Sequence, residues 1–174
     1  AFVNKGQIVE PVFITRIEDQ EGNVIYKNEP PVNSDPLISE ETAEQITAML
    51  CNAVNNGTGK ALRAVHGLKN EIAGKTGTTQ NHTDGWFVGM TPDYITAIWV
   101  GGDTPVVRFL SIAYGQGAYM ALPSFGKYMN AVYNDPAFSS KINSSFNISE
   151  ETLSKLECEE YKEKKFNSIR EYLE

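Results

Sequence analysis

The sequence predicts an α+β fold in which an antiparallel sheet packs against helices. Short apolar segments rich in β-branched and aromatic residues follow one another between residues 71 and 101, with polar turns between them. Longer segments with apolar residues every three or four positions lie on either side, near 40–55 and 122–134. The chain has 174 residues, of which 41% are hydrophobic, so it is long enough to bury a core.

The first element is a predicted hairpin in "PVFITRIEDQEGNVIYKN", residues 11–28. Alternating apolar residues on both sides of the Gly22-Asn23 pair are typical of two short strands joined at a turn. A Pro-rich linker follows and leads to a helix near 40–55, in which Ser39 is the expected N-cap. Its apolar positions are Ala43, Ile46, Leu50 and Val54.

A glycine-rich loop, "NNGTGKALRAVHG", precedes three predicted strands that form an antiparallel meander. The strands are expected at Glu71–Thr79, Gly85–Met90 and Tyr94–Gly101. Trp86, in a strand flanked by glycines, is expected to lie in the core.

Two further helices are predicted towards the C-terminus. One opens after Pro123 and continues to about residue 134. The other covers 150–174, with Ser149 as its N-cap and Leu153, Leu156 and Ile169 on its apolar side. We expect this acidic helix to be peripheral, so truncation after Ser149 should leave the melting temperature nearly unchanged.

Charge and composition exclude several functions. The net charge is −7 and the basic residues are scattered, which argues against a nucleic-acid partner. No apolar run approaches the roughly 20 residues that span a bilayer. Cys51 and Cys158 form no C-x-x-C pair, and Cys51 is expected to be an ordinary buried thiol. His66 and His82 are isolated, so we expect no metal and no cofactor.

The stretch "AGKTGTT", residues 73–79, allows two interpretations. A phosphate-binding loop would need G-x-x-x-x-G-K-[ST], but Lys69 stands where its first glycine should be. Such a loop also runs directly into a helix, whereas this stretch continues as a strand. The second interpretation, a strand that lines a cleft, is therefore favoured. Thr76 and Thr78 would then share one face about 6 to 7 Å apart and could bracket a carboxylate.

In this interpretation Gly77 would let an extended peptide approach the strand backbone, and Lys75 would add a positive charge. A plain strand with a solvent-facing lysine explains these four residues equally well. The wider sequence favours the first possibility. "AGKTGTT" and the following "DGWFVGMTPDYITAIWVGGD" resemble the third motif and adjoining strands of the transpeptidase domain of class A penicillin-binding proteins. "NNGTGKALR" and "GQGAYMALPSFGKYM" are similar in order and spacing.

The resemblance covers about residues 1–135 and implies the C-terminal portion of a domain of the penicillin-binding protein and serine β-lactamase fold; 136–174 would be an acidic, helical extension. It implies a peptidoglycan D,D-transpeptidase that cross-links stem peptides through a serine ester and binds β-lactams. Lys75, Thr76, Gly77 and Thr78 would bind substrate, with Lys75 in the proton shuttle and the Thr78 N–H as an oxyanion donor. The parent protein would sit in the bacterial cytoplasmic membrane, with this domain outside.

The family's S-x-x-K and S-x-N motifs should precede K-T-G, and neither does here. Ser124-Phe125-Gly126-Lys127 and Ser145-Phe146-Asn147 match by letter but follow Lys75, so we expect neither to be catalytic. We expect no nucleophile in this chain, which would be inactive alone and need the remainder of the domain. The alternatives are a non-catalytic peptide or β-lactam sensor module, discriminated by S-x-x-K upstream, or an interaction module built on the acidic tail.

Overall fold

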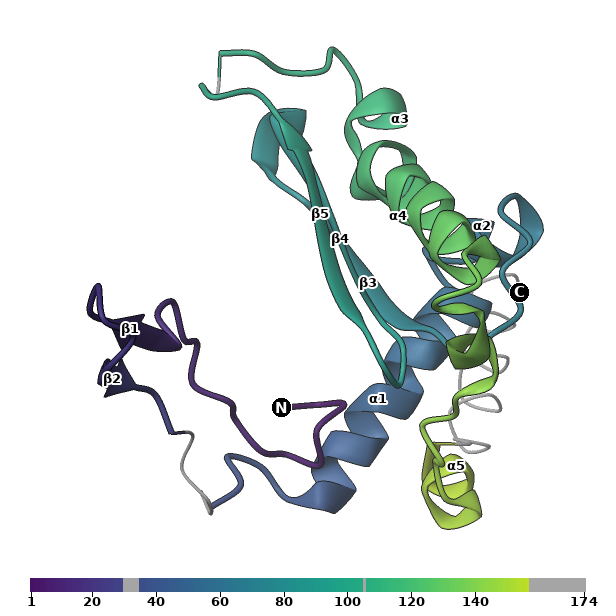
Figure 1. Ribbon diagram of the computed structural model, residues 1–174. Helices are drawn as coiled ribbons and strands as arrows, with labels where there is room; N and C mark the ends of the chain where they lie inside the picture. Colours follow the sequence, from purple (N-terminus) through teal and green to yellow (C-terminus); the bar gives the residue numbers. More distant parts are fainter. Residues whose placement is uncertain (30–34, 105, 157–174) are drawn as a thin grey trace, which may run out of the picture.

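A computed structural model describes residues 1–29, 35–104 and 106–156. A three-stranded antiparallel sheet forms its centre, in the order β3 (Ala73–Thr78), β4 (Asp84–Met90) and β5 (Ile95–Gly101). Helix α4 (Gly117–Asn134) runs along one face, and α1 (Glu40–Asn55) crosses beside β3 (Figure 1). The α+β class and the predicted meander are confirmed.

The core lies between this sheet and the helices. Phe87 of β4 and Phe125 of α4 are fully buried, with ring centroids 4.9 Å apart. Gly89 makes this contact possible, since a Cβ there would lie 2.3 Å from the Phe125 ring. Gly85 is similar, with Met120 of α4 2.6 Å from the place of a Cβ. The remaining buried members of the cluster are Val54, Leu62, Leu68, Ile72, Ala121, Leu122, Met129 and Tyr133.

The opposite face of the sheet is more open. Trp86 and Trp99 are 42% and 43% exposed, with ring centroids 6.4 Å apart. The expectation that Trp86 lies in the core is therefore wrong. Side chains alternate along a strand, and because Phe87 points towards α4, its neighbour Trp86 must point away.

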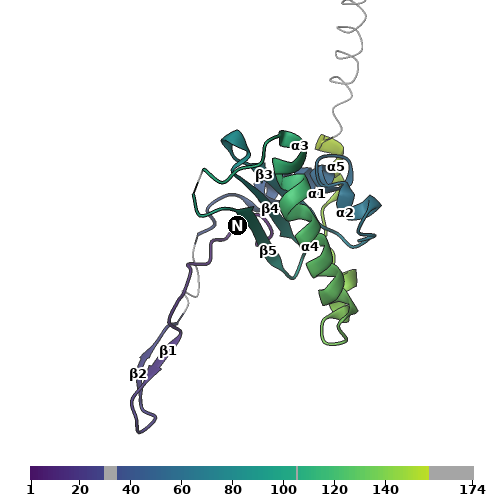
Figure 2. The same cartoon turned by 90° about the horizontal axis from the view of Figure 1, so that it is seen from above.

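The N-terminal hairpin is confirmed as β1 (Arg16–Glu18) paired antiparallel with β2 (Val24–Lys27). The Asp19 carboxylate stabilises the turn between the two strands, because it accepts hydrogen bonds from the backbone N of Asn23 at 2.7 Å and of Glu21 at 3.1 Å. All residues of both strands are exposed, and the hairpin extends away from the sheet and helices (Figure 2).

Helix α1 has the predicted bounds, and Ser39 is its N-cap, with Oγ accepting from Thr42 N at 3.1 Å. Helix α4 differs from the prediction. It begins at Gly117 rather than after Pro123, which lies inside it. Gly117 has no local helix-start signal and is placed by its packing on the sheet, where a Cβ would lie 2.3 Å from Gly77 O. The shorter elements are α2 (Ala61–Ala64), η1 (Gln80–His82), α3 (Ile112–Gly115) and η2 (Ser139–Asn143).

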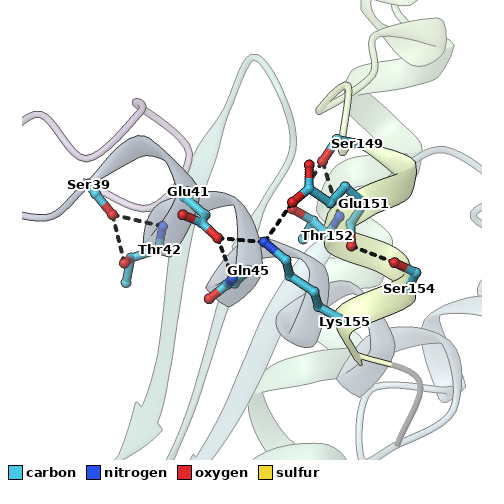
Figure 3. A network of polar contacts seen from close by, with 9 residues as sticks. All are labelled: Ser39, Glu41, Thr42, Gln45, Ser149, Glu151, Thr152, Ser154 and Lys155. Atoms are coloured by element: carbon cyan, nitrogen blue, oxygen red, sulfur yellow. Dashed lines mark hydrogen bonds and ion pairs between the residues drawn. The ribbon is translucent and has the colours of Figure 1, made fainter.

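The C-terminal segment packs on α1 through helix α5 (Glu150–Leu156) (Figure 3). Ser149 caps α5 as predicted, because its Oγ accepts from Thr152 N at 3.2 Å. Lys155 bonds to Glu41 of α1 at 2.8 Å. Thr152 is only 3% exposed, so one residue of this helix is buried against α1, and whether the helix is peripheral to the stability of the domain stays a prediction. The rest of the predicted helix, with Cys158 and Ile169, lies outside the described residues.

Residues before α5 also bind two exposed carboxylates, those of Glu71 and Asp93. Phe146 N donates to Glu71 Oε2 at 2.7 Å, and Ser145 Oγ bonds to Glu71 Oε1 at 3.0 Å. Lys141 pairs with Asp93, in the turn between β4 and β5, at 2.8 Å. We call residues 141–156 the C-terminal strap, because they bind acidic groups of α1, of the segment before β3 and of the turn between β4 and β5.

Candidate functional site

The K-T-G-T residues lie on β3, at an edge of the described sheet. β3 pairs with β4 on one side, with Thr76 opposite Phe87 and Thr78 opposite Gly85. Thr79 N donates to Asp84 O at 3.1 Å, so this pair is hydrogen-bonded across the ladder. Bonded and non-bonded pairs alternate along an antiparallel ladder. The N–H groups of Thr78 and Thr76 therefore point away from β4, towards the open edge.

Lys75 and Thr76 form one polar group at this edge. The exposed Lys75 places Nζ 2.9 Å from Thr76 O and 3.4 Å from Thr76 Oγ1. Thr76 Oγ1 in turn lies 3.0 Å from Thr58 Oγ1. The Lys75 ammonium and the Thr58 hydroxyl thus both lie within hydrogen-bond distance of the Thr76 hydroxyl, which is a suitable environment for a carboxylate.

Thr78 is held separately. Its Oγ1 accepts a hydrogen bond from Gly117 N at 3.1 Å. Because that bond occupies an acceptor position, the Thr78 hydroxyl can still donate its proton to a ligand. Gly77 lies opposite Trp86, and a Cβ on Gly77 would be 3.1 Å from the Trp86 Cβ. The strand is therefore closely packed at Gly77 and carries a threonine hydroxyl on each side of it.

Thr58 is a member of this group that sequence reasoning did not single out. It lies in the glycine-rich loop between α1 and α2, 18 positions before Thr76. The signal was the Gly57-Thr58-Gly59 triplet, which brackets a hydroxyl with two small residues. Only the folded chain shows that this hydroxyl meets β3.

The structure places the two other serine motifs elsewhere. Ser124 and Lys127 are exposed on α4, whose buried residues, such as Phe125, face the core. Ser145 binds Glu71, which precedes β3 and so lies at the opposite end of the strand from Thr78. Asn147 N donates back to Ser145 Oγ at 3.1 Å, which forms a local turn.

Cys51, His66 and His82 lie in structural contacts. Burial raises the pKa of the Cys51 thiol to about 11, so the thiol stays protonated and is a poor nucleophile at neutral pH. Within the described residues Cys51 forms no disulfide. The His66 ring packs on α4 at Gly126, and the His66 carbonyl accepts from Asn130 Nδ2 at 2.9 Å. The His82 carbonyl accepts from Phe109 N at 3.1 Å.

Two features are absent from residues 1–29, 35–104 and 106–156. These residues contain no group of three or more His, Cys, Asp or Glu side chains that could hold a metal ion. None of their helices has both the length and the apolar character needed to cross a membrane.

Comparison with known proteins connects this strand with a family. The family model described as "Penicillin binding protein transpeptidase domain" matches residues 1–105, which include all of β3. Penicillin-binding protein 1A of Rickettsia typhi is 32% identical over 167 residues and matches 83% of the chain. The Aquifex aeolicus protein of the same name is 37% identical over 131 residues, covering 75% of the chain. The chain spans about a fifth of the length of these curated relatives.

Solved structures show the same fold. The crystal structure of penicillin-binding protein 1A from Haemophilus influenzae superposes with a TM-score of 0.64 at 24% identity. The match covers 78% of this chain and 25% of that one. The penicillin-binding protein PonA1 from Mycobacterium tuberculosis also gives 0.64, at 22% identity, over 86% of this chain and 39% of that one.

Proposed function

The chain belongs to the penicillin-binding protein transpeptidase family, and we propose that it forms the substrate-binding part of a peptidoglycan D,D-transpeptidase. One observation carries this proposal. On β3 the Lys75 ammonium lies beside the Thr76 hydroxyl, and the Thr78 hydroxyl keeps a proton to donate while it accepts from Gly117 N. The N–H groups of Thr76 and Thr78 point away from β4, towards the open edge of the described sheet.

This donor set suits the C-terminal end of a stem peptide. The peptide would lie along β3 as an additional strand, since main-chain pairing at an open edge is a common mode of peptide recognition. Lys75 and the hydroxyls of Thr76 and Thr78 would hold its terminal carboxylate. The Thr78 N–H, which points to the same edge, would donate to the scissile carbonyl oxygen and stabilise the charge that develops on it.

The reaction would be acyl transfer through a serine ester. A serine hydroxyl attacks the carbonyl carbon and loses its proton to a neighbouring base, and the terminal amino acid leaves. An amine of a second stem peptide then attacks the ester, which forms the cross-link and releases the serine. A β-lactam would acylate the same serine, but its opened ring remains attached.

We place the nucleophile outside this chain. Before Lys75 the chain contains only two serines, Ser34 and Ser39. Ser39 Oγ is engaged as the N-cap of α1, and Ser34 lies outside the described residues. The remainder of the transpeptidase domain would supply S-x-x-K and S-x-N. The parent protein would be anchored in the bacterial cytoplasmic membrane with this domain on its outer side.

Incubation with excess benzylpenicillin followed by intact-mass spectrometry tests the proposal. We expect no adduct on the 174-residue chain and one adduct on a protein that also contains the upstream S-x-x-K motif. A stoichiometric adduct on Ser124 or another serine of this chain would contradict the placement of the nucleophile. Reversible binding without an adduct in the longer protein would instead support a recognition or sensor module.

A further inference from the structure

We propose that Thr58 is a positioning residue for Thr76 and determines how the Thr76 hydroxyl presents its proton to a substrate carboxylate. The proposal rests on the proposed function of β3. Its starting observation is the 3.0 Å contact between the two Oγ1 atoms, which joins the loop after α1 to the edge strand.

The loop fixes Thr58 in place. Gly59 N donates to Ala53 O of α1 at 3.0 Å, and a Cβ on Gly59 would lie 2.9 Å from the Val54 Cα. Leu62, which is fully buried in the core, anchors the other side of the loop. The exposed Thr58 side chain therefore projects from a backbone that is attached to α1 on one side and to the core on the other.

Hydrogen-bond direction gives Thr58 its role. The Lys75 ammonium has only donors, so at 3.4 Å it leaves Thr76 Oγ1 as the acceptor. If the Thr76 hydroxyl donates to a carboxylate, its contact with Thr58 requires Thr58 to be the donor. The result is a chain from Thr58 O–H to Thr76 O–H to the anion, in which each bond strengthens the next.

Thr78 is arranged in the same way, which supports this interpretation. Its Oγ1 accepts from Gly117 N at 3.1 Å and keeps its own proton for a ligand. The hydroxyls of Thr76 and Thr78 would therefore each accept a hydrogen bond from a donor outside β3, Thr58 Oγ1 and Gly117 N. Thr76 differs in that its partner is a side chain, so the contact can be removed by a single substitution.

The first test measures the orientation of Thr76 in the ligand-free chain. Three-bond couplings from the Thr76 methyl carbon to the backbone nitrogen and carbonyl carbon report its χ1 angle. We expect single-rotamer values in the wild type and in Thr58→Ser, and averaged values in Thr58→Val. Thr42→Val is the matched control, because it removes a hydroxyl from the 2.8 Å Ser39–Thr42 pair at the other end of α1. Single-rotamer couplings in Thr58→Val would overturn the proposal.

The second test measures acylation in a protein that contains the upstream nucleophile. With benzylpenicillin, Thr58→Val should lower the second-order rate constant about two- to ten-fold, as expected for one lost hydrogen bond, and Thr58→Ser should restore it. With benzylpenicillin methyl ester, which lacks the carboxylate, Thr58→Val and Thr58→Ser should be acylated at the same rate as the wild type. An equal loss with both compounds would overturn the proposal. Absence of acylation in the wild type would refute the proposed function instead, and the coupling data would then decide the role of Thr58.

Discussion

The amide nitrogen of Gly117 donates a hydrogen bond to Oγ1 of Thr78 across 3.1 Å. This bond joins the last residue of β3 to the first residue of α4, 39 positions later. Because α4 packs Phe125 and its neighbours on the sheet, the core and the candidate site share one support. A change in the position of α4 therefore changes the position of the Thr78 hydroxyl.

Gly117→Ala should destabilise the protein by about 1–3 kcal/mol, the usual cost of overpacking. The added Cβ would lie 2.3 Å from Gly77 O and 2.4 Å from Trp86 O, so the start of α4 must move. Urea unfolding checks this, with Ser124→Ala on the exposed side of α4 as a control expected within about 0.5 kcal/mol of wild type. Wild-type stability in Gly117→Ala would contradict the close packing.

Lys75→Ala should slow acylation by benzylpenicillin at least about 10-fold in a protein that contains the complete domain. The fold should persist, because the Lys75 side chain is exposed and, in the part of the chain that the structure describes, its ammonium donates to Thr76 alone. Lys127→Ala removes another exposed lysine, on α4, and should have no effect. A Lys75→Ala rate within about twofold of wild type would show that this lysine does not act on the substrate.

Trp86→Ala should cost about 1–2 kcal/mol of unfolding free energy, since part of the indole surface is already in water. Phe87→Ala, one position along, should cost about 3–5 kcal/mol because the ring is fully buried. Urea unfolding of both variants gives the comparison. If Trp86→Ala were the more damaging substitution, the assignment of the two faces of β4 would be wrong.

Truncation after Ile148 should lower the free energy of unfolding by about 1–2 kcal/mol, or the melting temperature by roughly 2–8 °C. It removes the buried Thr152 and the contact of Lys155 with Glu41. Thermal unfolding checks this, and a melting temperature equal to that of the full chain would show that α5 is peripheral after all.

The same truncation should raise the pKa of Glu44. The Ser149 N–H donates to the Glu44 carboxylate and lowers the pKa of that carboxyl from its ordinary 4.5. A carboxyl with a lowered folded-state pKa contributes stability at neutral pH and loses it as the pH falls below its ordinary value. NMR titration of the Glu44 carboxyl carbon gives both pKa values; equal values in the full and truncated chains would contradict the contact.

Local signals explain which elements the sequence predicted. The cap at Ser39, the turn at Gly22-Asn23 and the alternating strands near Lys75 are each encoded within a few residues, and the structure has them all. Other features depend on contacts distant in sequence. Alternation shows that Trp86 and Phe87 point to opposite faces, but only the placement of α4 decides which face is buried.

The candidate site shows the same division. The K-T-G-T letters indicate a strand and a donor set, and their order suggested the family. The partners that hold the two hydroxyls lie 18 and 39 positions away, at Thr58 and Gly117, and no local pattern connects them. The strap was missed for the same reason, since Glu44 and Ser149 are 105 positions apart.

Gly85 and Gly89 lie on the face of β4 that packs against α4, and this face tolerates no larger side chain at either position. On the side of α4, any added atom meets Met120 or Phe125 and pushes the helix outward. On the other side, Trp86 can change size without reaching α4. Substitutions in this strand should therefore be tolerated best at Trp86 and Val88, which are not buried. At the two glycines they would alter the alignment of the Thr78 hydroxyl, although that hydroxyl lies on a different strand.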